Sequence, residues 1–261
     1  MSVPVAPAAV KPRPGAKLGL RALYEGLLTA ILLIGVETIT RWTFGPSTLS
    51  RNVTSIHGRL AIVGVVVAVL LAALILTPLG RASGGHMNPG ISVAMWRYGL
   101  LEPGAVPLYL TAQLAGSVVG VLIGRLLWGP VTGRPPLSYA VLHPAPGWNA
   151  AGVFPVEAAS MATIIVIIAL FLGSQKLASK VPFAVGTCVG LVIFSLGPVT
   201  GGVANPARQF GPAVISGQTQ LLWVFLLAPL IGGFLAPVIQ RFLPGPKPTT
   251  HALCGPAAQR S

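Results

Sequence analysis

Six long apolar runs constrain this chain more than any other feature of its sequence. Each holds roughly twenty residues, the length that an α-helix needs to cross the hydrocarbon core of a bilayer. Hydrophobic residue types make up 53% of the chain and charged types only 8%, whereas a soluble domain carries about 25% charged residues. We therefore expect an all-α membrane protein. The predicted spans are residues 18–40, 60–79, 104–127, 154–173, 182–199 and 221–240.

The few charged residues predict membrane orientation rather than nucleic-acid binding. The formal net charge is +13, but the cations are scattered between apolar runs and are not clustered with aromatic residues. They favour the side that holds both chain ends, so the positive-inside rule predicts cytoplasmic termini. Cys188 and Cys254 show neither a pairing pattern nor metal-ligand spacing. We expect no metal, no cofactor and no nucleic-acid partner.

The chain contains two copies of a three-span unit, at about residues 18–127 and 154–240. Because three is odd, the copies must enter the membrane in opposite senses, which is the inverted-repeat architecture. Matching residues recur at equivalent places in the two copies. The pairs are Ser83–Gly84–Gly85 with Thr200–Gly201–Gly202, Asn88–Pro89 with Asn205–Pro206, and Glu25 with Glu157.

Each Asn-Pro step is a good helix start, since Asn is a preferred N-cap and Pro at the first helical position loses no hydrogen bond. The sequences that follow, ISVAMW and RQFGPAV, are apolar for only about ten residues, which reaches the middle of a bilayer without crossing it. The preceding glycines allow extended backbone and positive φ. We therefore expect two half-helices that enter from opposite faces and meet at the midplane.

Such a meeting has an electrostatic consequence. Two helix N-termini, each equivalent to about half a positive charge, would point at one spot and repel cations and protons. The amides of Asn88 and Asn205 can donate to the oxygen of a passing water or hydroxyl group. The alternative is that each Asn-Pro step merely caps an interfacial helix. The predicted midplane residues are Asn88, Pro89, Gly90, Asn205, Pro206 and Ala207.

These features resemble the major intrinsic protein family, the aquaporins and aquaglyceroporins. The resemblance is carried by GGHMNPG, GGVANPAR, the two glutamates, AQLAGSVVG in span three and WVFLLAPLIGG in span six. It implies a right-handed bundle of six helices and two half-helices, assembled as a homotetramer in the cell membrane with one pore per protomer. Residues 18–242 would form the channel domain, between disordered tails at 1–17 and 243–261.

The resemblance also implies a selectivity filter of Ala68, Ile193, Gly202 and Arg208. If the correspondence with the family is shifted by one residue, Phe194 takes the place of Ile193 in the filter. For Arg208, the alternative is a structural or snorkelling role. This filter lacks the aromatic residue and histidine of water-selective members and is similar to that of plant nodulin-26-like channels. The implied cargo is glycerol, boric acid or arsenous acid, together with water.

Two departures from the family pattern bear on this expectation. Gly90 replaces the usual alanine, which removes a methyl group where the half-helices abut. Gln209 replaces the aspartate that follows the pore arginine in glycerol facilitators. A water-selective aquaporin, an anion channel and an ion-coupled transporter stay open as alternatives. An enzyme is not expected, since the sequence has no nucleophile–base pair, metal-ligand cluster or phosphate loop.

The remaining polar residues in the apolar runs have two interpretations each. By resemblance, Glu25 and Glu157 hold the backbone of the strands that lead into the half-helices, and a proton relay is the alternative. His86 is expected to orient backbone, with pH gating as the alternative. Glu37 is expected at the membrane interface.

Overall fold

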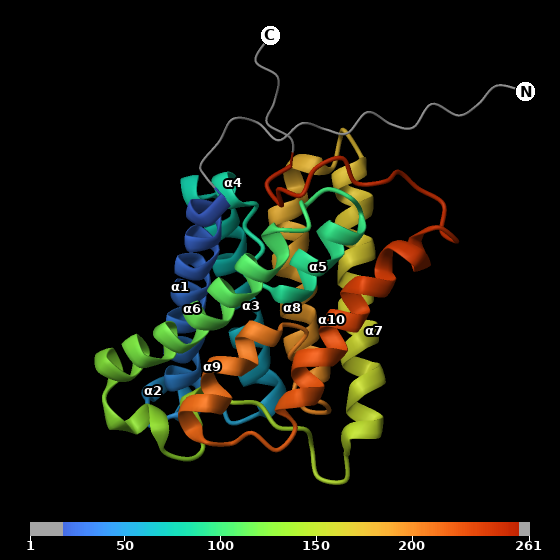
Figure 1. Cartoon of the computed structure of the whole chain (residues 1–261). Coiled ribbons are helices and arrows are strands. Elements are labelled where there is room, and N and C mark those ends of the chain that lie inside the picture. The colour runs from blue at the N-terminus through green and yellow to red at the C-terminus, as the bar shows by residue number, and fades with distance from the viewer. Residues whose placement is uncertain (1–17, 256–261) are drawn as a thin grey trace, which may run out of the picture.

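Six long helices form the frame of the molecule. The computed structural model describes residues 18–255, which contain no β-strand (Figure 1). All six predicted spans are confirmed, with α3 and α7 each beginning four residues earlier than expected, at Ile56 instead of 60 and at Ala150 instead of 154. Each of the six is long and apolar enough to cross a membrane. They are α1 (Leu18–Phe44), α3 (Ile56–Leu76), α6 (Ala105–Trp128), α7 (Ala150–Gly173), α8 (Val181–Leu196) and α10 (Leu222–Gln240).

Two short helices begin at the Asn-Pro steps, α5 (Pro89–Arg97, nine residues) and α9 (Pro206–Ser216, eleven residues). At 1.5 Å per residue they are about 14 and 17 Å long, roughly half the hydrocarbon core. The other short elements lie in connections within residues 18–255. They are α2 (Thr48–Asn52), α4 (Pro78–Ser83), η1 (Pro130–Gly133), η2 (Ser138–Ala140) and η3 (Ala178–Lys180).

The Asn-Pro steps start these helices as the sequence predicts. Asn88 and Asn205 are the N-caps and have extended backbone, with φ of −153° and −149°. The Asn88 side-chain oxygen accepts from the Gly90 amide at 2.9 Å, and that of Asn205 accepts from the Ala207 amide at 3.0 Å. These bonds satisfy N–H groups that have no partner inside a helix.

The two repeats pack in matching ways. Helix α1 lies against α6 as α7 lies against α10, while α9 packs on α6 and α5 on α10. Helices α3 and α8 contact each other where the two repeats meet. Small residues allow these close approaches: a Cβ added to Gly26 would lie 2.9 Å from the Ala112 carbonyl oxygen, and one on Gly116 would collide with the Gly26 backbone. Close backbone packing of this kind holds membrane helices together.

The expectation of a disordered tail after residue 242 is wrong for residues 244–255. This segment, here called the strap, crosses the end of the bundle at which α1 begins (Figure 1, red). Its Leu253 side chain is fully buried, and its backbone bonds to Gly84. The prolines and glycines of the strap prevent a helix but not an extended path with partners from other elements. Residues 1–17 and 256–261 lie outside the described residues.

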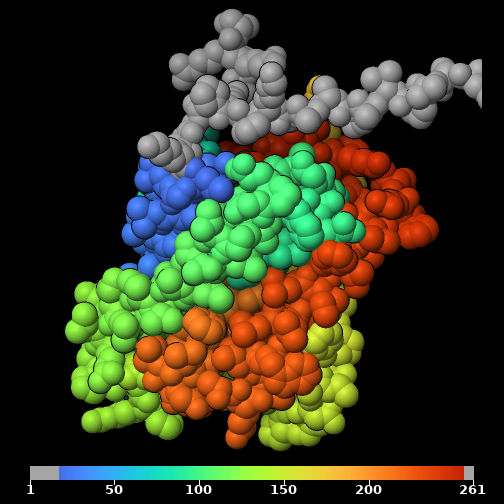
Figure 2. Space-filling model, in the orientation of Figure 1, coloured from blue at the N-terminus to red at the C-terminus, as the bar shows by residue number. Residues whose placement is uncertain are grey.

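For orientation, we call the end where α1 begins and the strap lies the terminal end, and the opposite end the loop end. Figure 2 shows the strap as a dark red band across the terminal end, above the surface formed by α6, α9 and α10. Residues 18–242 form one helical bundle, and the strap lies across its terminal end.

Replacing Gly116 by Leu should destabilise the fold, because the side chain has no room against the Gly26 backbone. The expected loss is about 3 kcal/mol, or roughly 6–12 °C in Tm for a chain of this size. Thermal unfolding of the purified protein in detergent measures it. Gly19→Leu is the matched control, since nothing lies within 4 Å of a Cβ at that position. An unchanged Tm in the Gly116 variant would contradict the packing.

Candidate functional site

The first approach strand, residues 84–88, is held by a buried carboxylate. Glu25 is fully buried in α1, and its Oε1 accepts from the Ser83 hydroxyl at 2.7 Å and the His86 amide at 3.0 Å. Its Oε2 accepts from the Met87 amide at 2.7 Å and from the side-chain amide of Gln113 at 2.9 Å. The carboxylate therefore satisfies strand N–H groups that neither helix nor sheet could pair.

The second approach strand, residues 201–205, repeats this arrangement. Glu157 is fully buried in α7, and its Oε1 accepts from the Thr200 hydroxyl at 2.7 Å and the Val203 amide at 3.2 Å. Its Oε2 accepts from the Ala204 amide at 2.8 Å. Ala204 and its counterpart Met87 have positive φ, 43° and 49°, a strained state for such residues that needs outside support. This geometry favours the anchoring role over a proton relay.

The two half-helices meet through their capping asparagines. The Asn88 amide donates to the Ala204 carbonyl at 3.0 Å, and the Asn205 amide donates to the Met87 carbonyl at 2.9 Å. Each asparagine thus bonds to the residue just before the other one. Both Pro89 and Pro206 are buried at this junction. The amides each have a second N–H; that of Asn88 has the Met161 sulfur at 3.9 Å, a weak acceptor.

A cavity of about 180 Å³ runs along this junction. One wall is apolar and comes mainly from α1, α3 and α8. The other consists of both approach strands, both asparagines and Arg208. The apolar wall includes Leu32, Val36, Phe44, Leu60, Val63, Val67, Leu71, Ile75, Val185, Val189 and Ile193. The cavity therefore offers hydrocarbon on one side and hydrogen-bonding groups on the other.

Three of the four expected filter residues line this cavity, namely Ile193, Gly202 and Arg208. Phe194, the alternative to Ile193, does not: it is 42% exposed and its ring lies edge-on to His57, with centroids 5.9 Å apart. The structure thus brings Ile193, and not Phe194, to the cavity.

Ala68 is not brought to the cavity wall. It lies at the contact between α3 and α8, where its carbonyl oxygen occupies the space beside Gly186. Val67, one residue earlier, lines the cavity instead. The difference arises from the rotation of α3 about its axis. Two glycines on α8 leave room for the small Ala68 in the contact between the helices, and Val67 therefore faces the cavity.

The half-helix positions after the prolines are enclosed by neighbouring helices. A Cβ on Gly90 would lie 3.0 Å from both the Met161 methyl group and the Pro229 carbonyl oxygen, so the missing methyl group faces α7 and α10 rather than the other half-helix. Ala207 is fully buried, and its carbonyl accepts from the Ser117 hydroxyl.

Glu37, which is expected at the membrane interface, is buried within the protein, at 2% exposure. Its carboxyl group occupies the space that the missing side chain of Gly124 leaves on α6.

The connection between α6 and α7 completes the loop end of the cavity, and sequence reasoning missed it. Arg208 donates from Nη1 to the Ala140 carbonyl at 2.6 Å. Gln209 bonds the Leu142 backbone twice, accepting from its amide at 3.1 Å and donating to its carbonyl at 2.8 Å. Gln209 therefore fixes the loop that Arg208 contacts. No sequence signal marks this, because the partners are main-chain atoms of an irregular segment.

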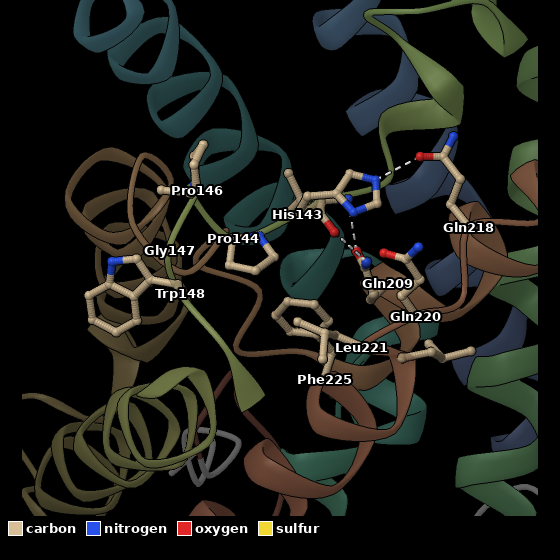
Figure 3. Close-up of a pocket in the computed structure, with 13 residues that line it drawn as sticks. His143, Pro144, Pro146, Gly147, Trp148, Gln209, Gln218, Gln220, Leu221 and Phe225 are labelled. Carbon is tan, nitrogen blue, oxygen red and sulfur yellow. Dashed lines mark hydrogen bonds between the residues drawn. The ribbon is translucent and has the colours of Figure 1, made fainter. Parts of the chain in front are cut away.

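A second, more open cavity of about 390 Å³ lies at the loop end, beside this connection. Figure 3 shows His143 bonded to Gln218, at 2.7 Å, with Gln209 and Gln220 nearby and Trp148 on the opposite side. The linings of the two cavities have Leu142 in common.

Comparison with known proteins supplies the family. Residues 18–240 match the family model described as Major intrinsic protein. The chain belongs to the major intrinsic protein family. It is therefore an aquaporin-type channel embedded in a membrane, through which water and small solutes pass, and not an enzyme.

Several relatives of this major intrinsic protein are aquaporins. It is 30% identical over 195 residues to "Probable aquaporin NIP7-1" of Arabidopsis thaliana, which covers 72% of this chain and 68% of that protein. It is 31% identical to "Probable aquaporin TIP3-2" of Oryza sativa subsp. japonica, over 95% of this chain and 89% of the relative. A solved aquaglyceroporin from Plasmodium falciparum has the same fold, with a TM-score of 0.68, 20% identity and coverage of 87% and 97%.

Replacing Glu157 by Ala should impair folding before it changes selectivity. The substitution leaves the Thr200 hydroxyl and two strand amides without their acceptor, at an expected cost of about 3–5 kcal/mol. Thermal unfolding in detergent measures the loss. Glu102→Ala is the control, because Glu102 forms an exposed ion pair with Arg21 worth less than about 1 kcal/mol. A stable Glu157 variant with altered transport would contradict the anchoring role.

Proposed function

We propose that this channel conducts small uncharged polyhydroxy solutes, of the glycerol, boric acid or arsenous acid type, together with water. The observation that carries the proposal is the cavity with one apolar wall and one wall of hydrogen-bonding groups. A polyhydroxy solute can place its carbon or boron framework against the aliphatic wall while its hydroxyl groups bond to Asn88, Asn205 and Arg208. An aliphatic wall also leaves more room than the aromatic residue and histidine of a water-selective filter.

Exclusion of cations and protons would rest on three positive ends at one place. The N-termini of α5 and α9 lie at the asparagine junction, and each is equivalent to about half a positive charge. The Arg208 guanidinium, close by on the first turn of α9, adds a full charge. A hydrated cation would therefore be repelled. The carboxylates of Glu25 and Glu157 could not take the place of its water ligands, because they already accept hydrogen bonds from backbone amides.

The same arrangement argues against the alternatives. An ion-coupled transporter needs free acidic or polar groups for Na⁺ or H⁺ at the midplane, and both glutamates there are engaged. An anion would be attracted by Arg208, but it would have to lose its hydration against an aliphatic wall. A neutral hydroxyl-bearing solute has neither difficulty.

For the cellular setting we propose a homotetramer in the plasma membrane with the terminal end in the cytoplasm. Basic residues near that end support the orientation by the positive-inside rule; in the described chain they are Arg21, Arg81, Arg97, Lys176, Lys180, Arg241 and Lys247. Exposed apolar side chains on α1, α3 and α8 offer surface to lipid and to neighbouring protomers. The glycerol-type solute agrees with the name of the solved aquaglyceroporin, while the plant relatives are named aquaporins.

Val67→Phe should separate the proposed cargo from water. The larger side chain enters the cavity and should lower glycerol and boric acid permeability about tenfold or more while water permeability falls less, since the loss is steric. Stopped-flow light scattering of proteoliposomes measures all three permeabilities. Val66→Phe is the matched control, because Val66 is 39% exposed and does not line the cavity.

The wild-type protein decides the broader question in the same assay. Permeability to water alone, with glycerol and boric acid at the level of empty liposomes, would overturn the proposed cargo in favour of a water-selective aquaporin. Flux of chloride or nitrate above background would favour an anion channel.

A further inference from the structure

The strap binds directly to the first approach strand. The Leu253 amide donates to the Gly84 carbonyl at 2.9 Å. The His86 ring donates from Nε2 to the His251 carbonyl, also at 2.9 Å, because a carbonyl oxygen can only accept. A Cβ on Gly84 would lie 2.7 Å from His251 Nδ1, so the absence of a side chain there lets the strap approach. Two main-chain positions of the strap thus engage the segment that leads to Asn88.

Further contacts fasten the strap along its length. The Thr249 hydroxyl donates to the Leu172 carbonyl at 3.3 Å, and the Gln240 side chain donates to the Pro246 carbonyl at 3.1 Å. The Leu253 side chain is fully buried within the main hydrophobic core. Burying one leucine contributes about 1.5–3 kcal/mol, so a single side chain supplies much of the affinity of the strap for the bundle.

The strap bonds to a residue that lines the cavity at its terminal end. At the terminal end, the residues lining the narrow cavity are Ile75, Gly85 and His86, and His86 is the one that the strap holds. Ser92 fixes the other ring nitrogen of His86, at 3.0 Å. The imidazole of this cavity-lining residue is therefore held between α5 and the strap.

We propose that the strap is a built-in closing element of the terminal mouth. Docked, it holds His86 in place and blocks exit from the cavity; undocked, it frees the imidazole and opens the path. The inference rests on the proposed conduction function, but it concerns how fast all solutes pass and not which ones do.

The surroundings of His251 make docking sensitive to acid. Its Nε2 accepts from Arg21 at 3.3 Å, and burial, His86 and Arg21 lower the pKa of His251 from its ordinary 6.5 to about 3. The docked strap therefore needs a neutral imidazole. Above pH 6.5 docking is unaffected, and as the pH falls below 6.5 the undocked form gains a proton and is favoured. The docking equilibrium should fall about thirtyfold from pH 7.5 to pH 5.

Water permeability of proteoliposomes should accordingly rise between pH 7.5 and pH 5, and His251→Asn should remove the rise. The other titratable and charged groups around this position are Arg21, Glu25, His86, Glu102 and Tyr109, and they are unchanged in the variant. A pH response that persists in His251→Asn would overturn the role of His251.

The direct test expels the strap from the folded, full-length channel. Leu253→Glu places a charge in the core and should release the strap, raising water and glycerol permeability by about threefold or more with their ratio unchanged. Leu243→Glu is the matched control, since Leu243 is 44% exposed just before the strap. Hydrogen exchange of the backbone amides in residues 244–255 reports release.

Two outcomes would overturn the proposal: a released strap with unchanged permeability, or an equal rise in the Leu243 control. If the Leu253 variant fails to fold, a protease site inserted after Leu243 allows the strap to be cut from the already reconstituted channel. Unchanged permeability after complete removal of the fragment would also overturn it. A changed ratio of glycerol to water permeability would instead bear on the proposed cargo.

Discussion

The structure depends on two buried carboxylates that bind irregular backbone at membrane depth. A strand without a neighbouring strand cannot satisfy its own amides in lipid, and each unpaired amide would cost several kcal/mol. Glu25 and Glu157 accept from the amides of the two residues before each capping asparagine. Residues of both strands line the cavity. The same bonds that stabilise the strands therefore create the polar wall of the pathway.

Because the strands are fixed, the half-helices can start inside the bundle with their N-termini facing each other. Asn88 and Asn205 cap their own helices and bond to the opposite strand, so the same two side chains start the half-helices and link them to each other. The positive helix ends concentrate where a solute must pass. The bonds that stabilise the fold are thus also the bonds on which the proposed charge selectivity depends.

Much of this arrangement could be predicted from the sequence, because repeated motifs and apolar run lengths are local signals. The spans, the half-helices and the equivalence of Glu25 and Glu157 in the two repeats all followed from these signals. Ala68 and the strap could not be placed, because both depend on tertiary packing. Glycines on α8 set the rotation of α3, and the order of residues 244–255 depends on partners in distant elements. From its proline-rich composition alone, the strap is predicted to be a disordered tail.

The most direct measurement of the central claim is electrical. Protein that raises solute flux in vesicles can be reconstituted into planar bilayers, and its conductance to protons, Na⁺ and K⁺ recorded under applied voltage. If the opposed helix N-termini repel cations, bilayers that contain the protein should conduct protons, Na⁺ and K⁺ no better than protein-free lipid. This should hold at every protein density that raises solute flux. An ohmic proton or cation current that scales with the amount of protein would contradict the account.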